Sequence, residues 1–87
     1  MFSVYVCSNS DYQHLTDTDL IKAIEICERL EKWFDCDTRI LNHVYSDSEF
    51  ITIANAKKYL KQLKSWYRRG DLLKQDYIDA VRGEWVL

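Results

Sequence analysis

Cysteine and histidine recur at one spacing in this chain. Cys7 and His14 are separated by six residues, and so are Cys36 and His43. Two thiolates and two imidazoles are enough for a tetrahedral zinc site. Structural zinc sites, however, usually hold two ligands close together as C-x2-4-C or H-x3-5-H, and neither pattern occurs here. We therefore expect small hydrophobic cysteines and hydrogen-bonded histidines, with no metal site.

The same residue types could serve a nucleophilic enzyme. A Cys/His pair, or a triad of Ser8, Asp11 and His14, would need side chains to converge in the fold, and no local motif supports either. The sequence contains no G-x-G-x-x-G, no P-loop and no H-E-x-x-H. Its two glycines, Gly70 and Gly83, lie near the C-terminus and cannot form a phosphate cradle. We expect neither an enzyme nor a cofactor.

The strongest candidate for a binding site is a basic stripe on a helix predicted to end at Gly70. Its members recur at i, i+4, i+7 and i+11, with two more on the flank: Lys57, Lys61, Lys64 and Arg68, then Lys58 and Arg69. Like charges at helical spacing cost about 0.2–0.5 kcal/mol per pair. An anionic group is therefore expected opposite the stripe, supplied by the chain's own carboxylates, by a partner protein or by the phosphates of nucleic acid.

The opposite side of this helix is apolar. At 100° per residue, one arc holds Ile53, Ala56, Tyr59, Leu60, Leu63, Trp66 and Tyr67. Because these aromatic residues do not interleave with the lysines, we expect them to hold the fold together and not to stack on bases. The acidic residues Glu28, Glu31 and Asp35 of an earlier helix are candidates to face the stripe, with exposed pairs contributing about 0–1 kcal/mol each.

The elements that position these residues follow from hydrophobic period and capping. Residues 2–7 and 39–45 alternate as strands, and the polar residues 8–14 favour a loop. Thr16 or Asp17 is expected to cap a helix ending near Asp35, whose core stripe is Leu20, Ala23, Ile24, Cys27, Leu30 and Phe34. The long helix starts between residues 47 and 54, where Ser46–Glu49 has the form of a capping box. A short helix over 72–82, capped by Asp71, follows.

This order predicts a β-α-β-α-α domain of the α/β class, with α+β as the alternative. We expect a two-stranded or slightly larger sheet covered by helices. A long helix between two strands favours a parallel βαβ crossover, and antiparallel pairing is left open. Leu73, Tyr77, Ala80 and Val81 are expected to share the buried face of the last helix.

Composition limits the class of protein. The 87 residues predict one domain with one core, and three cysteines without framework spacing favour the cytoplasm. No apolar stretch is long enough for a membrane span, so no membrane partner is expected. The net charge of −2 is unevenly distributed along the chain: residues 1–56 carry a net charge of −6 and residues 57–87 a net charge of +4. A generic nucleic-acid binder would be basic throughout.

These observations predict a non-enzymatic protein-interaction module that acts by occupying a partner's surface. Trp33, Phe50 and Trp85 are not absorbed by the predicted core and are candidate interface aromatics. A homodimer is a natural alternative for so small a domain. Compact chains without catalytic motifs are common among phage and mobile-element inhibitors of host complexes, including anti-CRISPR proteins, and that class is our expectation. The alternative is a nucleic-acid-binding module that uses the basic stripe on phosphates.

Overall fold

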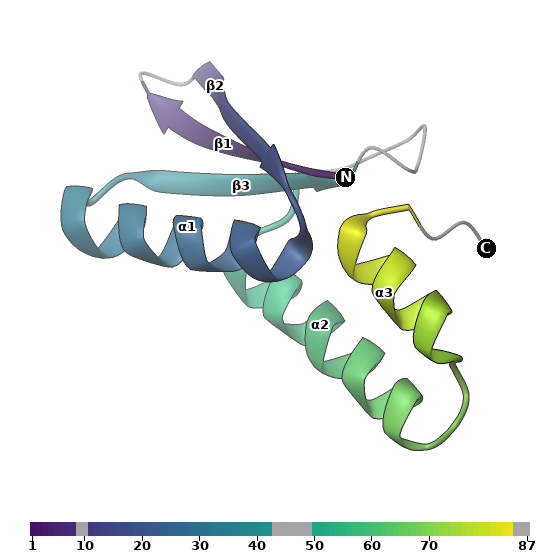
Figure 1. The fold of residues 1–87 in the computed structure, drawn as a ribbon. Helices are drawn as coiled ribbons and strands as arrows, with labels where there is room; N and C mark the ends of the chain where they lie inside the picture. The colour runs from purple at the N-terminus through teal and green to yellow at the C-terminus, as the bar shows by residue number, and fades with distance from the viewer. Residues whose placement is uncertain (9–10, 43–49, 85–87) are drawn as a thin grey trace.

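The structure is a computed structural model that describes residues 1–8, 11–42 and 50–84. Three strands and three helices follow one another as β1 (Phe2–Ser8), β2 (Asp11–Thr18), α1 (Leu20–Phe34), β3 (Asp37–Asn42), α2 (Ile53–Arg68) and α3 (Lys74–Arg82). The strands form one antiparallel sheet in the order β2-β1-β3, and the helices lie on one side of it (Figure 1). The chain is thus a mixed α/β domain, as predicted, with a sheet one strand larger than the minimum.

The loop predicted over residues 8–14 was wrong, because residues 11–18 form an additional strand, β2. It pairs antiparallel with β1 from Phe2↔Thr18 to Cys7↔Tyr12, with a bulge at the extra residue Leu15. Sequence reasoning missed it because β2 is an edge strand, exposed along most of its length, and therefore carries polar residues. Thr16 and Asp17, the expected helix caps, belong to this strand.

The β-α-β unit therefore starts at β2 and not at β1. Both β2 and β3 run antiparallel to β1, so they are parallel to each other, with β1 between them and α1 as the connection. β3 was expected over 39–45 and begins two residues earlier, at Asp37; residues 43–45 lie outside the described part of the chain. The two strands predicted from the sequence, now β1 and β3, are neighbours that pair antiparallel, so the parallel crossover expected between them was wrong and the antiparallel alternative is the one found.

Helix α1 begins where a carboxylate caps it. The side chain of Asp19 accepts a hydrogen bond from the Lys22 backbone N–H at 2.7 Å, which satisfies a group that a helix N-terminus leaves unpaired. The helix ends at Phe34, and Asp35 then adopts the left-handed conformation with φ 50°. The buried face of α1 is formed by Leu20, Ala23, Ile24 and Cys27, as predicted.

Helix α2 starts at Ile53, inside the predicted range. Thr52 caps it, its hydroxyl accepting from the Asn55 N–H at 3.4 Å, and Ile51 forms a bridge to Ile40 at the edge of β3. The predicted capping box at 46–49 lies outside the described residues. At the other end, Gly70 has φ 82° and the Asp71 N–H donates to the Trp66 carbonyl at 2.9 Å, which closes the helix as expected of a glycine there.

Helix α3 returns along α2, and the rings of Tyr67 and Tyr77 stack between them at 4.9 Å. Its N-cap is Leu73 with no side-chain hydrogen bond, so the predicted cap by Asp71 was wrong. Leu73 also precedes the first turn and is 73% exposed, not buried as predicted. At the C-terminal end, the Met1 amino group donates to the Gly83 carbonyl at 2.9 Å, joining α3 to the start of β1.

The core lies between the sheet and the three helices. Every element except β2 contributes buried residues to it: Phe2, Val4 and Ile40 from β1 and β3, Leu20, Ala23, Ile24 and Cys27 from α1, Ala56 and Leu63 from α2, and Ala80 and Val81 from α3. With one face of each helix used in this way, the other faces are free to present side chains. Within the described chain, no helix has the length and apolar character that crossing a membrane requires.

Candidate functional site

The basic surface of α2 consists of the six predicted cations, and all six are exposed: Lys57, Lys58, Lys61, Lys64, Arg68 and Arg69. They point outward because Ala56 and Leu63 turn the other side of the helix into the core. The helical period that the sequence predicted therefore places the cations together. Arg68 lies in the last turn of α2 and Arg69 at its C-cap, where the negative end of the helix dipole favours positive charge.

In the described chain, carboxylates lie beside the two ends of this surface and not beside its middle. Lys57 Nζ lies 3.2 Å from Glu28 Oε1 of α1, and Arg69 Nε lies 3.5 Å from Asp71 at the end of α2. Among the described residues, no carboxylate lies within 4.0 Å of the charged groups of Lys61, Lys64 or Arg68. Of the three acidic residues Glu28, Glu31 and Asp35, all in the described structure, Glu28 alone lies within 4.0 Å of a cation of the stripe.

Glu31 is engaged elsewhere. Its carboxylate accepts a hydrogen bond at 2.7 Å from the hydroxyl of Thr38, a residue that is buried on β3. The acidic residues of α1 therefore differ in their contacts: Glu31 bonds to the buried Thr38, whereas Glu28 faces Lys57. Most of the positive charge on α2 is left without an internal partner in the described chain.

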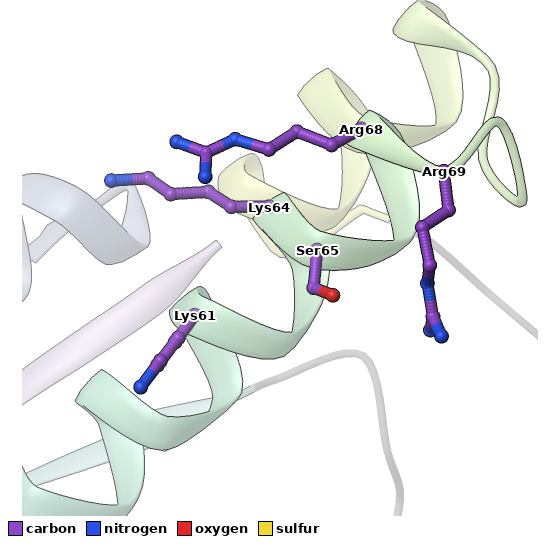
Figure 2. Close-up of a pocket in the computed structure, with 5 residues that line it drawn as sticks. All are labelled: Lys61, Lys64, Ser65, Arg68 and Arg69. Atoms are coloured by element: carbon purple, nitrogen blue, oxygen red, sulfur yellow. The ribbon is translucent and has the colours of Figure 1, made fainter.

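The unmatched cations line an open pocket of about 410 Å³. Its walls are the side chains of Lys61, Lys64, Ser65, Arg68 and Arg69 (Figure 2). Lys64 and Arg68, one turn apart, extend in the same direction. Among the described residues, no carboxylate lines the pocket, and Ser65 adds a hydroxyl to the cationic N–H donors. Donors of these kinds suit an anion with several oxygen acceptors.

A second exposed surface lies at the C-terminal end of α1. Trp33, a predicted interface residue, is 72% exposed, and Phe34 is equally exposed. Lys32 lies with its Nζ 5.8 Å from the centre of the Trp33 ring. Phe34 was expected in the core, which was wrong: the buried residues of α1 stop at Cys27, and the chain reverses at Asp35 directly after Phe34.

The other predicted interface aromatics differ from Trp33. Phe50 is 42% exposed, and its ring stacks on Tyr12 at 4.8 Å and meets Tyr5 edge-on at 4.9 Å. It therefore covers part of the sheet face that points away from the helices. Trp85 lies outside the described residues. Sequence reasoning missed this cluster, because Tyr12 was placed in a loop and its alternation with His14 on β2 was not recognised.

Of the residues considered for catalysis and metal binding, His14 is placed by the structure, whereas the side chain of Ser8 lies outside the described part of the chain. His14 Nε2 lies 2.7 Å from Asp17, and the same carboxylate accepts from the buried Ser3 hydroxyl. The carboxylate thus lies between hydroxyl and imidazole, whereas a nucleophilic triad places the imidazole in the middle. No three His, Cys, Asp or Glu side chains gather as a metal site in the described chain, and His43 lies outside it.

Cys27, a buried residue of α1, has a displaced pKa. Burial raises the pKa of its thiol, a hydrogen bond from Thr38 acts in the opposite direction, and the neighbouring Glu31 and Cys36 add to the increase. The thiolate is the nucleophilic form of cysteine, so this environment suppresses reactivity. Cys27 is therefore part of the core and not a candidate nucleophile.

Comparison with known proteins adds no relative: no family model, no curated protein and no solved structure matches this chain.

Proposed function

We propose that this chain is a non-enzymatic protein-interaction module that occupies the surface of a partner protein. The observation that supports this most is the adjacent pair Trp33 and Phe34, each 72% exposed at the end of α1. Large aromatic side chains are enriched at the energetic centres of protein interfaces. Adjacent exposed aromatic rings leave apolar surface in water that a partner can cover.

The free energy available from burying these two rings favours a role for them as anchors of an interface. An aromatic side chain buries about 150–250 Å² in an interface, and about 25 cal/mol per Å² then gives roughly 3–4 kcal/mol for the exposed part of each ring. A micromolar complex has a binding free energy of about −8 kcal/mol, after association costs of at least about 4 kcal/mol. The two rings can thus supply much of the affinity, and charge supplies orientation.

The shape of the molecule suits an inhibitor or adaptor. It extends over 43 × 26 × 16 Å, and the aromatic end of α1 and the basic end of α2 lie at opposite ends of the view in Figure 1. In its narrowest form, the proposal states that this chain is a small phage or mobile-element protein that blocks a host multi-subunit complex in the cytoplasm, as anti-CRISPR proteins do. The small size of the chain and its lack of catalytic motifs support this narrower form.

The test compares variants of two equally exposed apolar residues. Proteins are captured from a lysate of the source cell on three immobilised forms of the chain: the wild type, Trp33→Ala and the matched control Leu73→Ala. Leu73 is 73% exposed on another part of the surface. We expect a protein retained by the wild type and by Leu73→Ala but lost from Trp33→Ala. A captured protein retained by all three forms of the chain, or no protein retained by any of them, would contradict the proposal.

A homodimer is the special case in which the partner is a second copy. Sedimentation of the wild type and of Trp33→Ala decides it, because loss of a dimer in the variant would assign Trp33 to a self-interface.

A second candidate function is nucleic-acid binding by the basic surface of α2. The observation that favours it is the set of cations with no carboxylate partner among the described residues, Lys61, Lys64 and Arg68. Phosphate contacts release counterions, so binding of mixed-sequence DNA or RNA would weaken steeply between about 50 and 200 mM salt. An absence of binding at the lower salt concentration would exclude this candidate.

A further inference from the structure

We propose that the pocket at the C-terminal end of α2 binds a run of two or three consecutive phosphate groups, as the backbone of a nucleic-acid strand presents them. This inference rests on the second candidate function and narrows it from the whole basic surface of α2 to one site. The site consists of Lys61, Lys64, Ser65, Arg68 and Arg69.

The donors in the pocket suit phosphate oxygens. A guanidinium presents five N–H groups in a planar fork that matches phosphate geometry, and a lysine ammonium adds a compact point charge. Arg68 and Arg69 supply the forks, Lys61 and Lys64 the ammonium groups, and Ser65 a hydroxyl donor. Among the described residues that line the pocket there is no carboxylate, and the nearby Asp71 engages only Arg69.

The first turns of α2 are not part of this site. Lys57 already lies 3.2 Å from Glu28, so a phosphate would have to displace a carboxylate there. Lys58 is exposed but does not line the pocket. Arg69 also has a carboxylate nearby, Asp71 at 3.5 Å, but both side chains are mostly exposed and can exchange partners at little cost.

The length of the site sets the number of phosphates. From Lys61 to Arg69 is eight residues, or about 12 Å along a helix at 1.5 Å per residue. At the duplex advance of about 3.4 Å per phosphate, this length spans about three to four phosphates. An extended single strand advances further per phosphate, so about two or three of its phosphates fit. A longer contact would meet carboxylates at both ends of the site, Glu28 beside Lys57 and Asp71 beside Arg69.

The experiment is a titration of a fluorescently labelled 20-nucleotide single strand into the full chain between 50 and 200 mM salt. Each neutralised phosphate of a single strand contributes about 0.7 to the slope of log affinity against log salt. Two or three contacts therefore predict a slope of about −1.4 to −2.1. Inorganic tripolyphosphate is the competing probe, because it carries consecutive phosphates without sugar or base, and we expect it to displace the strand.

Two single charge reversals on the same helix locate the contact. Lys61→Glu removes a pocket cation and should lower affinity at least tenfold and the slope by about one contact. Lys58→Glu makes the same charge change on an exposed lysine outside the pocket, and should change affinity no more than about threefold. Circular dichroism and thermal melting confirm that both variants are folded.

The outcomes separate the site from the function. Equal losses in Lys58→Glu and Lys61→Glu, or a slope near −4 as six contacts would give, would overturn the pocket while leaving nucleic-acid binding intact. Binding of tripolyphosphate but not of the strand, lost in Lys61→Glu, would uphold a consecutive-phosphate site and reject the nucleic-acid strand as its source. No binding of either probe at 50 mM salt would overturn both the site and the second candidate function.

Discussion

At the scale of single residues, Asp19 determines where α1 begins. Its carboxylate accepts from the Lys22 N–H at 2.7 Å, while the residues before it belong to β2. Replacing a capping aspartate by alanine typically costs about 0.5–2 kcal/mol. We expect Asp19→Ala to lower the free energy of unfolding by about 1 kcal/mol in urea denaturation. Asp19→Asn, which keeps a capping oxygen, should stay close to the wild type; an equal loss in both variants would show that the cap is not responsible.

The cysteines should differ in reactivity. Burial raises the pKa of the Cys27 thiol, whereas Cys7 and Cys36 are partly exposed. Alkylation of the native protein near neutral pH, followed by peptide mass spectrometry, should therefore modify Cys7 and Cys36 before Cys27. In denaturant, where the burial is lost, the three rates should converge. Modification of native Cys27 at the rate of the other two would contradict the buried position.

The same group makes stability depend on alkaline pH. Because the folded pKa lies above the unfolded value of about 8.5, Cys27 stabilises the fold fully below that pH. Its contribution should decrease as the pH rises from the unfolded pKa through the raised folded pKa.

At the scale of elements, the two glycines that end helices are not equivalent. Both have positive φ, 82° at Gly70 and 77° at Gly83, so a side chain strains either position. A Cβ at Gly83 would also lie 2.5 Å from the Met1 nitrogen, whereas no described atom lies within 4 Å of one at Gly70. Gly83→Ala should therefore destabilise the protein more than Gly70→Ala.

We expect about 1–2 kcal/mol for Gly70→Ala from backbone strain alone and at least about 1 kcal/mol more for Gly83→Ala from the clash. The measurement is the free energy of unfolding of both variants. Equal costs would mean that the contact between Met1 and the end of α3 does not constrain the fold.

Elements with a strong hydrophobic period could be predicted, and the others could not. Helices α1 and α2 were predicted because Leu20, Ala23 and Cys27 in one, and Ala56 and Leu63 in the other, recur at helical spacing on buried faces. β2 was missed because an edge strand needs no apolar alternation, and its residues favour turns equally well. The order of the strands was missed with it, since pairing depends on contacts far apart in sequence.

The candidate sites, too, could be predicted only as far as helical periodicity determines them. Periodicity placed the cations of α2 together, because helix geometry alone brings residues four apart onto one side. It could not show that Glu28 engages Lys57 while Lys61, Lys64 and Arg68 lack a described partner, since that depends on how α1 packs against α2. Nor could it show that Phe34 is exposed, because its position on the helix wheel is that of a core residue.

At the scale of the whole molecule, the two exposed surfaces differ in chemistry and in location. The aromatic surface lies at one end of α1 and the basic pocket at the far end of α2, in a molecule extending 43 Å along its longest axis (Figure 1). Ligands at the two surfaces could therefore be bound together. An adaptor or a blocking protein gains from this arrangement, because two separated contacts fix its orientation on a larger complex.

The most direct test of the proposed function is the affinity of the purified captured partner for three forms of the chain, measured by calorimetry. Truncation of an aromatic residue at an interface centre costs at least about 2 kcal/mol, or about thirtyfold in Kd. We predict this loss for Trp33→Ala and less than a threefold change for Leu73→Ala, with both variants as stable as the wild type. An unchanged Kd for Trp33→Ala would contradict the proposal that the exposed aromatic end of α1 is the binding surface.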